Sequence, residues 1–196
     1  MPTHNIDFKF ISKLEGGSQL TGYVPAAAIS KSGVTIATGF DLGARSKADI
    51  DKLNITAGLK KKLKPYTSLK KSAAVKYLKA NPLTITAVEA SSIDKAVKKT
   101  ATDSLIKRYN ASALNKNKIK FKDLPKQAQT VIASVSYQYG TLSTEAPKFW
   151  KKVVVQDWTA TLKILNNFGD AYPTRRKKEA MLLKKAIPKS TVKKKP

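Results

Sequence analysis

The sequence predicts an α+β fold, in which a short helix leads into a small antiparallel sheet and a series of helices follows. Residues 5–15 carry apolar side chains at helical spacing. Residues 18–45 are instead rich in Gly, Thr, Val, Ile and Ser and contain turn signals. From residue 46 onward a helical period returns. Because helical and extended segments are segregated, we expect two lobes with a cleft between them as the natural place for a site.

The expected helices are bounded by Gly, Pro and capping residues. Gly16-Gly17 closes the first helix, Pro65 ends another, and Asn81-Pro82 stops the one that follows. The remaining helices are expected at 48–53, 57–63, 68–79, 86–109, 123–139, 147–155, 158–168 and 174–186. The buried face of the longest is expected to contain Val88, Ile93, Val97, Leu105 and Ile106.

The domain organisation follows from the absence of internal repeats and of an interdomain linker in the sequence. We expect one domain over residues 1–187. Its small lobe would cover about 16–60, and its helical lobe about 65–187 together with helix 5–15. Residues 188–196 are rich in Lys and contain no acid, which predicts a flexible tail.

The composition is that of a globular protein with a large positive charge. Of the 196 residues, 41% are hydrophobic, which is enough for a well-buried core. The 38 Lys and Arg outnumber the 13 Asp and Glu, giving a formal net charge of +25 that predicts attraction to polyanions. Most of these cations are Lys, whose point charge favours non-specific surface attraction over bidentate reading of bases.

Several kinds of site are excluded by the residues that the sequence lacks. It has no Cys, which removes disulfides, thiol nucleophiles and thiolate metal sites. The single His4 argues against a His-based triad or zinc site, so we expect no metal and no cofactor. The N-terminus has no basic region followed by an apolar core, and no stretch is apolar for long enough to span a membrane. We therefore expect synthesis in the cytoplasm without a signal peptide.

Glu15 is the first catalytic candidate, because it ends the helix expected at 5–15. A helix C-terminus disfavours a carboxylate by up to about 1 kcal/mol. Glu15 follows Ile11 by four residues and Phe8 by seven, which places it on or beside the apolar stripe. A carboxyl against apolar surface should hold its proton more tightly, as a general acid must. The alternative is a frayed, solvated helix end.

Residues 34–41 alternate as a β-strand would. If the strand stays extended, one face is mostly apolar and the other carries small and polar side chains. This second face either leaves room for a ligand or is simply solvated. The apolar face would hold Val34, Ile36, Thr38 and Phe40, and the small face Thr35, Ala37, Gly39 and Asp41.

Asp41 would make a second carboxylate beside Glu15, although an Asx turn before Leu42-Gly43 is a competing explanation. The two acids suggest a paired-carboxylate hydrolase, in which one protonates a leaving oxygen and the other group activates or positions water. In inverting glycosidases the two carboxyls are roughly 6.5–9.5 Å apart. Thr35 would hold the water.

Six segments of the sequence, three near the N-terminus and three later, give further support for a hydrolase of this kind. The first three are Glu15-Gly-Gly, Leu20-Thr-Gly-Tyr-Val-Pro25 and Ser32-Gly-Val-Thr-Ile-Ala-Thr-Gly-Phe-Asp-Leu-Gly43. The later ones are Ser136-Tyr-Gln-Tyr-Gly140, Pro147-Lys-Phe-Trp150 and Tyr172-Pro-Thr-Arg-Arg-Lys-Lys-Glu-Ala180. Together, over about residues 8–186, they closely resemble the lysozyme-like domain of pesticin, a bacteriocin. More distantly, they are similar to the T-even phage lysozymes of glycoside hydrolase family 24.

The resemblance implies a lysozyme-like fold and hydrolysis of the β-1,4 bond between N-acetylmuramic acid and N-acetylglucosamine in peptidoglycan. Glu15 matches the general acid, and Thr35 matches the Thr that positions the attacking water. Asp41 matches the second carboxylate of the pesticin-like branch. In the phage pattern the catalytic Asp precedes the Thr, whereas residues 18–34 here contain no acid. Asp41 must therefore take that role, or the role is lost.

Residues nearer the C-terminus are implied as substrate-binding or supporting groups. Gln138, with Tyr137 beside it, matches an interlobe residue that contacts substrate, although core-edge packing is an alternative reading. Arg175 matches an Arg that pairs with the catalytic Glu in the phage enzymes, and Arg176 competes for that match. Trp150 and Trp158 are expected in the core rather than as sugar-stacking platforms.

The combined expectation is a monomeric, inverting muramidase that acts on glycan strands in the periplasm or cell wall of a target bacterium. Delivery stays open between an endolysin released through a holin and a toxin effector injected by a secretion apparatus. The effector would have a cognate immunity protein. The alternatives are a lysozyme fold with altered or lost activity and a basic, non-enzymatic binder of cell wall or nucleic acid. No aromatic-basic groove is apparent, so we expect no specific nucleic acid.

Overall fold

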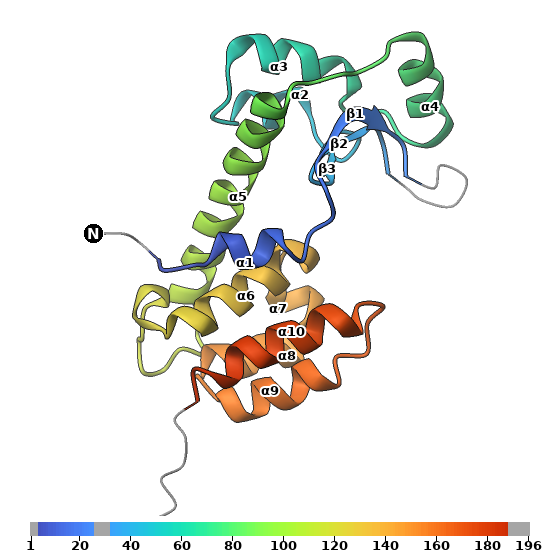
Figure 1. The fold of residues 1–196 in the computed structure, drawn as a ribbon. Helices are drawn as coiled ribbons and strands as arrows, with labels where there is room; N and C mark the ends of the chain where they lie inside the picture. The colour runs from blue at the N-terminus through green and yellow to red at the C-terminus, as the bar shows by residue number, and fades with distance from the viewer. Residues whose placement is uncertain (1–3, 26–31, 188–196) are drawn as a thin grey trace, which may run out of the picture. The chain divides into compact units, whose positions relative to one another are not determined.

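The computed structural model describes residues 4–25 and 32–187, which form helices, one three-stranded antiparallel sheet and the loops between them (Figure 1). The predicted α+β class is therefore confirmed. The chain divides into two compact units. The first, Glu15–Thr100, is called the sheet unit, and the second, Met1–Leu14 with Ala101–Pro196, is called the helical unit. Helix α5 (Ala87–Asn110) contributes to both. The Lys-rich tail expected at 188–196 lies outside the described residues.

Among its described residues, the sheet unit contains the sheet, three helices and the first part of a fourth. The strands are β1 (Gln19–Tyr23), β2 (Thr35–Ala37) and β3 (Phe40–Asp41), in the order β1-β2-β3. The helices are α2 (Lys47–Asp51), α3 (Ala57–Leu63), α4 (Lys71–Ala80) and the first part of α5, with a 3-10 turn at Lys64–Tyr66. Their apolar faces enclose one core, whose fully buried members include Val34, Ile36, Leu42, Ile50, Leu63 and Ile93.

The segment 34–41 is a hairpin, so the expectation of one extended strand is wrong. Ala37 and Gly39 have positive φ values of 51° and 76°, and these reverse the chain between β2 and β3. Thr35 then pairs with Asp41, and Ile36 pairs with Phe40. The face of Thr35 and Ala37 is also not solvated, because both residues are buried.

The helical unit is built around α6 (Lys126–Tyr139), which is buried continuously from Ala128 to Ser136. Helices α1 (Phe8–Ser12), α7 (Leu142–Glu145) and α10 (Pro173–Lys184) pack against it. Helix α9 (Trp158–Asn166) packs against α10 and α8 (Pro147–Val154), and a 3-10 turn covers Phe121–Asp123. Trp150 is buried in this core and Trp158 packs at its edge, as expected. None of the described helices is both long and apolar enough to cross a membrane.

Two sequence expectations about helices need correction. The first helix covers only Phe8–Ser12. It begins at Phe8 because the Asp7 side chain accepts a hydrogen bond from the Phe10 amide and caps the helix there, and Lys13 is its C-cap residue. Glu15 therefore follows the helix instead of ending it. Val88 is exposed, since the buried positions in the first part of α5 are Ala90, Ile93 and Ala96. The short helix α7 was not expected.

Candidate active site

Glu15 is largely buried and lies beside a lysine of α5. Its side chain is 16% exposed, and its Oε2 atom lies 2.9 Å from Nζ of Lys98. No described residue donates a hydrogen bond to this buried oxygen, because the Lys98 contact has the distance of an ion pair but not the angles of a hydrogen bond. The sequence had suggested an apolar setting for Glu15, but the ammonium group of Lys98 makes part of that setting charged. Charge attraction to Lys98 therefore compensates for the burial of this oxygen.

Helix α5 also holds the turn between β2 and β3, through the side chain of Asp94. Asp94 accepts hydrogen bonds from the amide of Thr38, at 3.2 Å, and from its hydroxyl, at 2.7 Å. Asp94 and Lys98 are four residues apart, so they share one face of the helix about 6 Å apart along its axis. Two adjacent turns of one helix therefore hold the Glu15 carboxyl and the hairpin turn.

Thr35 and Asp41 are brought together by the hairpin. They are direct partners in the antiparallel pair, so their side chains leave the same face with Cβ atoms about 4.5–5.5 Å apart. Asp41 Oδ1 accepts hydrogen bonds from the amides of Gly43, at 2.8 Å, and Gly33, at 3.1 Å. The Thr35 hydroxyl donates to the carbonyl of Gly33 at 3.3 Å. The Asx turn expected as a competing explanation for Asp41 is present, and it also fixes this carboxyl opposite Thr35.

The glycines of this segment are required by a close approach of three backbones. A Cβ atom on Gly33 would lie 2.1 Å from the carbonyl oxygen of Leu69 and 2.4 Å from Cα of Gly43. A Cβ atom on Gly43 would meet Leu69 and Gly33 in the same way. Only glycine fits at such distances. The Ser32–Gly43 motif therefore specifies the backbone packing that positions Asp41.

Tyr137 and Gln138 lie near the end of α6 and both are partly buried. The Tyr137 hydroxyl lies 2.5 Å from Oγ1 of Thr102, and its ring stacks on Phe8 with centroids 6.5 Å apart. The amide oxygen of Gln138 accepts a hydrogen bond from Arg176. Packing thus accounts for part of each side chain, and the substrate contact inferred for them stays a prediction.

Arg175 and Arg176 share one buried carboxylate, Glu179. Arg175 Nε lies 3.2 Å from Glu179 Oε1, and Arg176 contacts the other oxygen of that carboxylate. Arg176 also donates to Asp170 Oδ2 at 2.8 Å and lies over the ring of Phe168. Both arginines therefore have carboxylate partners within α10 itself, whereas the cation beside Glu15 is Lys98. The role carried over for Arg175 stays a prediction.

The charge network around Arg176 shifts the pKa values of its members, Asp170 and Arg176 among them. Burial alone would raise the pKa of Asp170, but hydrogen bonds from Tyr139, Arg176 and the Tyr172 amide hold it below its usual range. Burial alone would likewise lower the pKa of Arg176, but Glu179 and Asp170 raise it. The network is therefore charged on both sides, which is characteristic of a structural ion cluster.

Sequence reasoning missed Asp94 and Lys98. Their four-residue spacing on a helix is that of an ordinary solvated ion pair, so no local signal separates them from other charged positions. No cluster of three or more His, Asp or Glu that would suit a metal ion occurs within residues 4–25 and 32–187.

Comparison with known proteins places the chain in a family. A search of curated proteins found no match. The family described as "Pesticin: Bacterial toxin homologue of phage lysozyme, C-term" matches residues 5–159, which include Glu15, Thr35, Asp41 and Gln138 but neither Arg175 nor Arg176. Since the match covers well over half of the sequence, the chain belongs to the pesticin family, with the lysozyme-like fold of that group.

Proposed function

We propose that the protein is a muramidase, which hydrolyses the β-1,4 bond between N-acetylmuramic acid and N-acetylglucosamine in peptidoglycan. The observation that carries the proposal is the carboxyl of Glu15, which is largely buried and held by an ion pair between its Oε2 atom and Lys98. Membership of a family described as homologous to phage lysozyme gives this carboxyl its proposed chemistry.

Glu15 is the proposed general acid. Cleavage of a glycosidic bond needs a proton on the leaving oxygen as the bond to the anomeric carbon breaks. Because Oε2 faces Lys98, Oε1 is the oxygen that delivers this proton. A fixed carboxyl transfers its proton efficiently, since no rotation is needed when substrate binds.

Thr35 and Asp41 are the proposed water-positioning pair. Asp41 uses Oδ1 for the amides of Gly33 and Gly43, which leaves Oδ2 to accept a proton from water. The Thr35 hydroxyl, on the same face of the hairpin, would accept or donate the second hydrogen bond to that water. Water activated opposite the leaving group attacks the anomeric carbon and inverts its configuration.

The remaining proposals concern substrate contacts, the biological role of the protein and its delivery. Tyr137, Gln138, Arg175 and Arg176 are proposed as supporting or substrate-contacting residues. The family description as a bacterial toxin favours an antibacterial role, with peptidoglycan of a target bacterium as substrate and a cognate immunity protein as partner. Delivery by a holin or by a secretion apparatus remains part of the proposal, as does action as a monomer in the periplasm or cell wall.

The identity of the cleaved bond tests the proposal. Purified peptidoglycan is digested with the protein, the soluble products are reduced with borodeuteride, and their ends are identified by mass spectrometry. We expect deuterium on N-acetylmuramic acid. Deuterium on N-acetylglucosamine would identify a glucosaminidase, and anhydro ends would identify a lytic transglycosylase. Either result, or a folded protein that releases no product, would contradict the proposal.

A further inference from the structure

The three strands of the sheet contribute one residue each to a row that crosses the sheet. Tyr23 of β1 pairs with Thr35 of β2, and Thr35 pairs with Asp41 of β3. These three residues are called the cross-strand row. Directly opposed residues of antiparallel strands extend their side chains from the same face, with Cβ atoms about 4.5–5.5 Å apart. The side chain of Tyr23 therefore leaves the sheet next to that of Thr35, on the side away from Asp41.

The neighbours of the cross-strand row show which face of the sheet it occupies. Each member lies between two residues that face the core of the sheet unit. The flanking residues are Gly22 and Val24 around Tyr23, Val34 and Ile36 around Thr35, and Phe40 and Leu42 around Asp41. Gly22 is placed there because a Cβ atom on it would lie 3.2 Å from Cγ1 of the buried Val34. Successive side chains of a strand point to opposite faces, so the row lies on the face turned away from this core.

Tyr23 is the exposed aromatic residue of the sheet unit. It is 39% exposed, whereas Thr35 beside it is 3% exposed. Phe40 and Tyr66 are buried, and Tyr77 packs edge-to-face against Tyr66 with ring centroids 5.4 Å apart. A single exposed tyrosine is ordinary on a protein surface. What distinguishes Tyr23 is its place in the same row as the two residues proposed to hold the attacking water.

A sugar ring is the ligand that this arrangement suits. The C–H bonds on one face of a pyranose are weakly positive and pack against the negative face of an aromatic ring, while its hydroxyl groups stay at the rim. Neighbouring strands are about 4.7–4.9 Å apart, which is comparable to the length of one sugar unit in a β-1,4-linked glycan. We propose that Tyr23 stacks on the sugar next to the one whose anomeric carbon receives the water held by Thr35 and Asp41. This inference rests on the proposed muramidase function.

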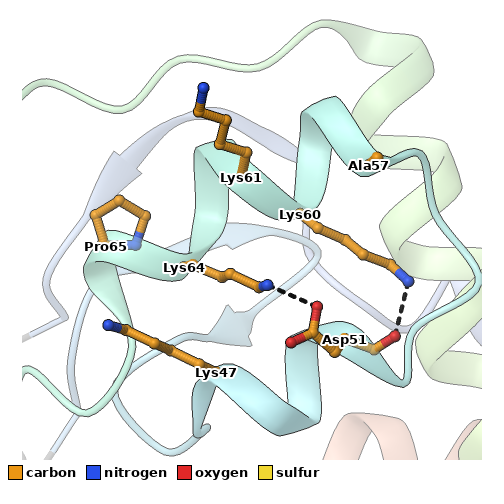
Figure 2. Close-up of a pocket in the computed structure, with 7 residues that line it drawn as sticks. All are labelled: Lys47, Asp51, Ala57, Lys60, Lys61, Lys64 and Pro65. Atoms are coloured by element: carbon orange, nitrogen blue, oxygen red, sulfur yellow. Dashed lines mark hydrogen bonds and ion pairs between the residues drawn. The ribbon is translucent and has the colours of Figure 1, made fainter.

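The pocket between α2 and α3 offers no comparable surface (Figure 2). Its volume is about 460 Å³, and none of the described residues that line it is aromatic. Figure 2 shows Lys60 and Lys64 turned toward Asp51, which accepts a hydrogen bond from the first and forms an ion pair with the second. The stacking surface is therefore assigned to the sheet and not to this pocket.

The test measures the binding of intact glycan strands to variants of Tyr23. Soluble, uncross-linked strands are labelled with a fluorophore at the reducing end, and fluorescence anisotropy gives Kd. Every protein carries Glu15→Gln, which removes the proposed acid and so keeps the strands intact. Tyr23→Phe, Tyr23→Leu and Tyr23→Ala leave the net charge unchanged, so diffuse charge attraction to the strands is the same in all of them.

The matched control is Tyr172→Ala, because Tyr172 is an exposed tyrosine of the helical unit, 53% exposed. Circular dichroism checks that each variant is folded. We expect Tyr23→Ala and Tyr23→Leu to raise Kd about tenfold, since both remove the aromatic face. Tyr23→Phe and Tyr172→Ala should change Kd by less than about twofold.

Two outcomes would overturn the inference and leave the muramidase proposal standing. One is an unchanged Kd in folded Tyr23→Ala protein, which would mean that the ring does not contact the glycan. The other is equal binding by Tyr23→Leu and Tyr23→Phe, which would mean that the contact is apolar but not a stacked ring. If the parent Glu15→Gln protein bound no glycan at all, the proposed function would itself be contradicted, and the inference with it.

Discussion

The Nζ atom of Lys98 lies 2.9 Å from Oε2 of Glu15, and both side chains are less than one-fifth exposed. Eighty-three positions separate them in the sequence, so the contact depends on how α5 packs in the sheet unit. Asp94, one turn earlier, holds the turn of the β2–β3 hairpin. The alignment of the proposed acid and the position of the hairpin therefore depend on the same face of one helix.

The first prediction concerns Lys98 as a positioning residue. Lys98→Met should lower kcat by about 10- to 100-fold with little change in KM, because a carboxyl displaced by about 1 Å loses its alignment with the leaving oxygen. The measurement is steady-state hydrolysis of soluble glycan strands. Lys95→Met, an exposed neighbour on α5, is the control and should keep full activity. Lys98→Arg should recover part of the lost kcat, and an unchanged kcat in Lys98→Met would disprove the positioning role.

The second prediction separates the charge of Asp41 from its structural role. Asp41→Asn keeps an oxygen for the amides of Gly33 and Gly43, so its melting temperature should stay close to that of the wild type. Its activity should still fall by about 100-fold, because an amide cannot accept the proton of the attacking water. Asp41→Ala should lose both stability and activity. If Asp41→Asn hydrolyses peptidoglycan at the wild-type rate, Asp41 serves only as a turn residue.

The third prediction concerns the backbone contacts behind the hairpin. Gly33→Ala should lower the free energy of unfolding by about 1–3 kcal/mol or more, since its Cβ atom would lie 2.1 Å from the Leu69 carbonyl oxygen. Gly58→Ala in α3 is the opposite case. Its Cβ atom meets nothing within 4 Å and its site is helical, so stability should rise by up to about 1 kcal/mol. Urea denaturation of both variants measures the difference, and equal effects would contradict this account.

The fourth prediction concerns the ion cluster of α10. Glu179 is fully buried and receives both Arg175 and Arg176, while Arg176 is 2% exposed. Glu179→Ala leaves buried positive charge without its main partner, so unfolding free energy should fall by about 3–5 kcal/mol. Glu145→Ala, at an exposed position of α7, should change it by less than about 0.5 kcal/mol. A small effect of Glu179→Ala would mean that the Asp170 carboxylate alone is enough to stabilise the buried charge of Arg176.

The fifth prediction is a pH dependence caused by Tyr109. Burial raises the pKa of its hydroxyl to about 12, although a hydrogen bond from Gln156 partly opposes the shift. The ordinary value is about 10, so the unfolded chain loses this proton first as pH rises. The contribution of the Tyr109 hydroxyl to the free energy of unfolding is fully present below pH about 10 and is lost as the pH rises toward about 12. Tyr109→Phe should show a smaller loss of unfolding free energy over that interval, and equal losses would contradict the assignment.

The parts of the fold that were predictable from sequence are those set by local patterns. Helix α6 was placed correctly because Val131, Ile132 and Val135 follow a helical period. The hairpin was missed because its turn needs positive φ values at both Ala37 and Gly39, and an alanine gives no reason to expect the first of them. Glu15, Thr35 and Asp41 were predicted as site residues by motif. The Lys98 contact was not identified, because it depends on long-range packing that no local spacing encodes.

The central claim is that Glu15 donates the proton that breaks the glycosidic bond. Glu15→Gln tests it most directly, since the amide keeps the size of the side chain but cannot act as an acid. Release of muropeptides from purified peptidoglycan is followed for the wild type and for this variant, with thermal unfolding as the check on folding. We predict that folded Glu15→Gln protein releases muropeptides about 10²- to 10⁴-fold more slowly than the wild type. Release at the wild-type rate would contradict the account.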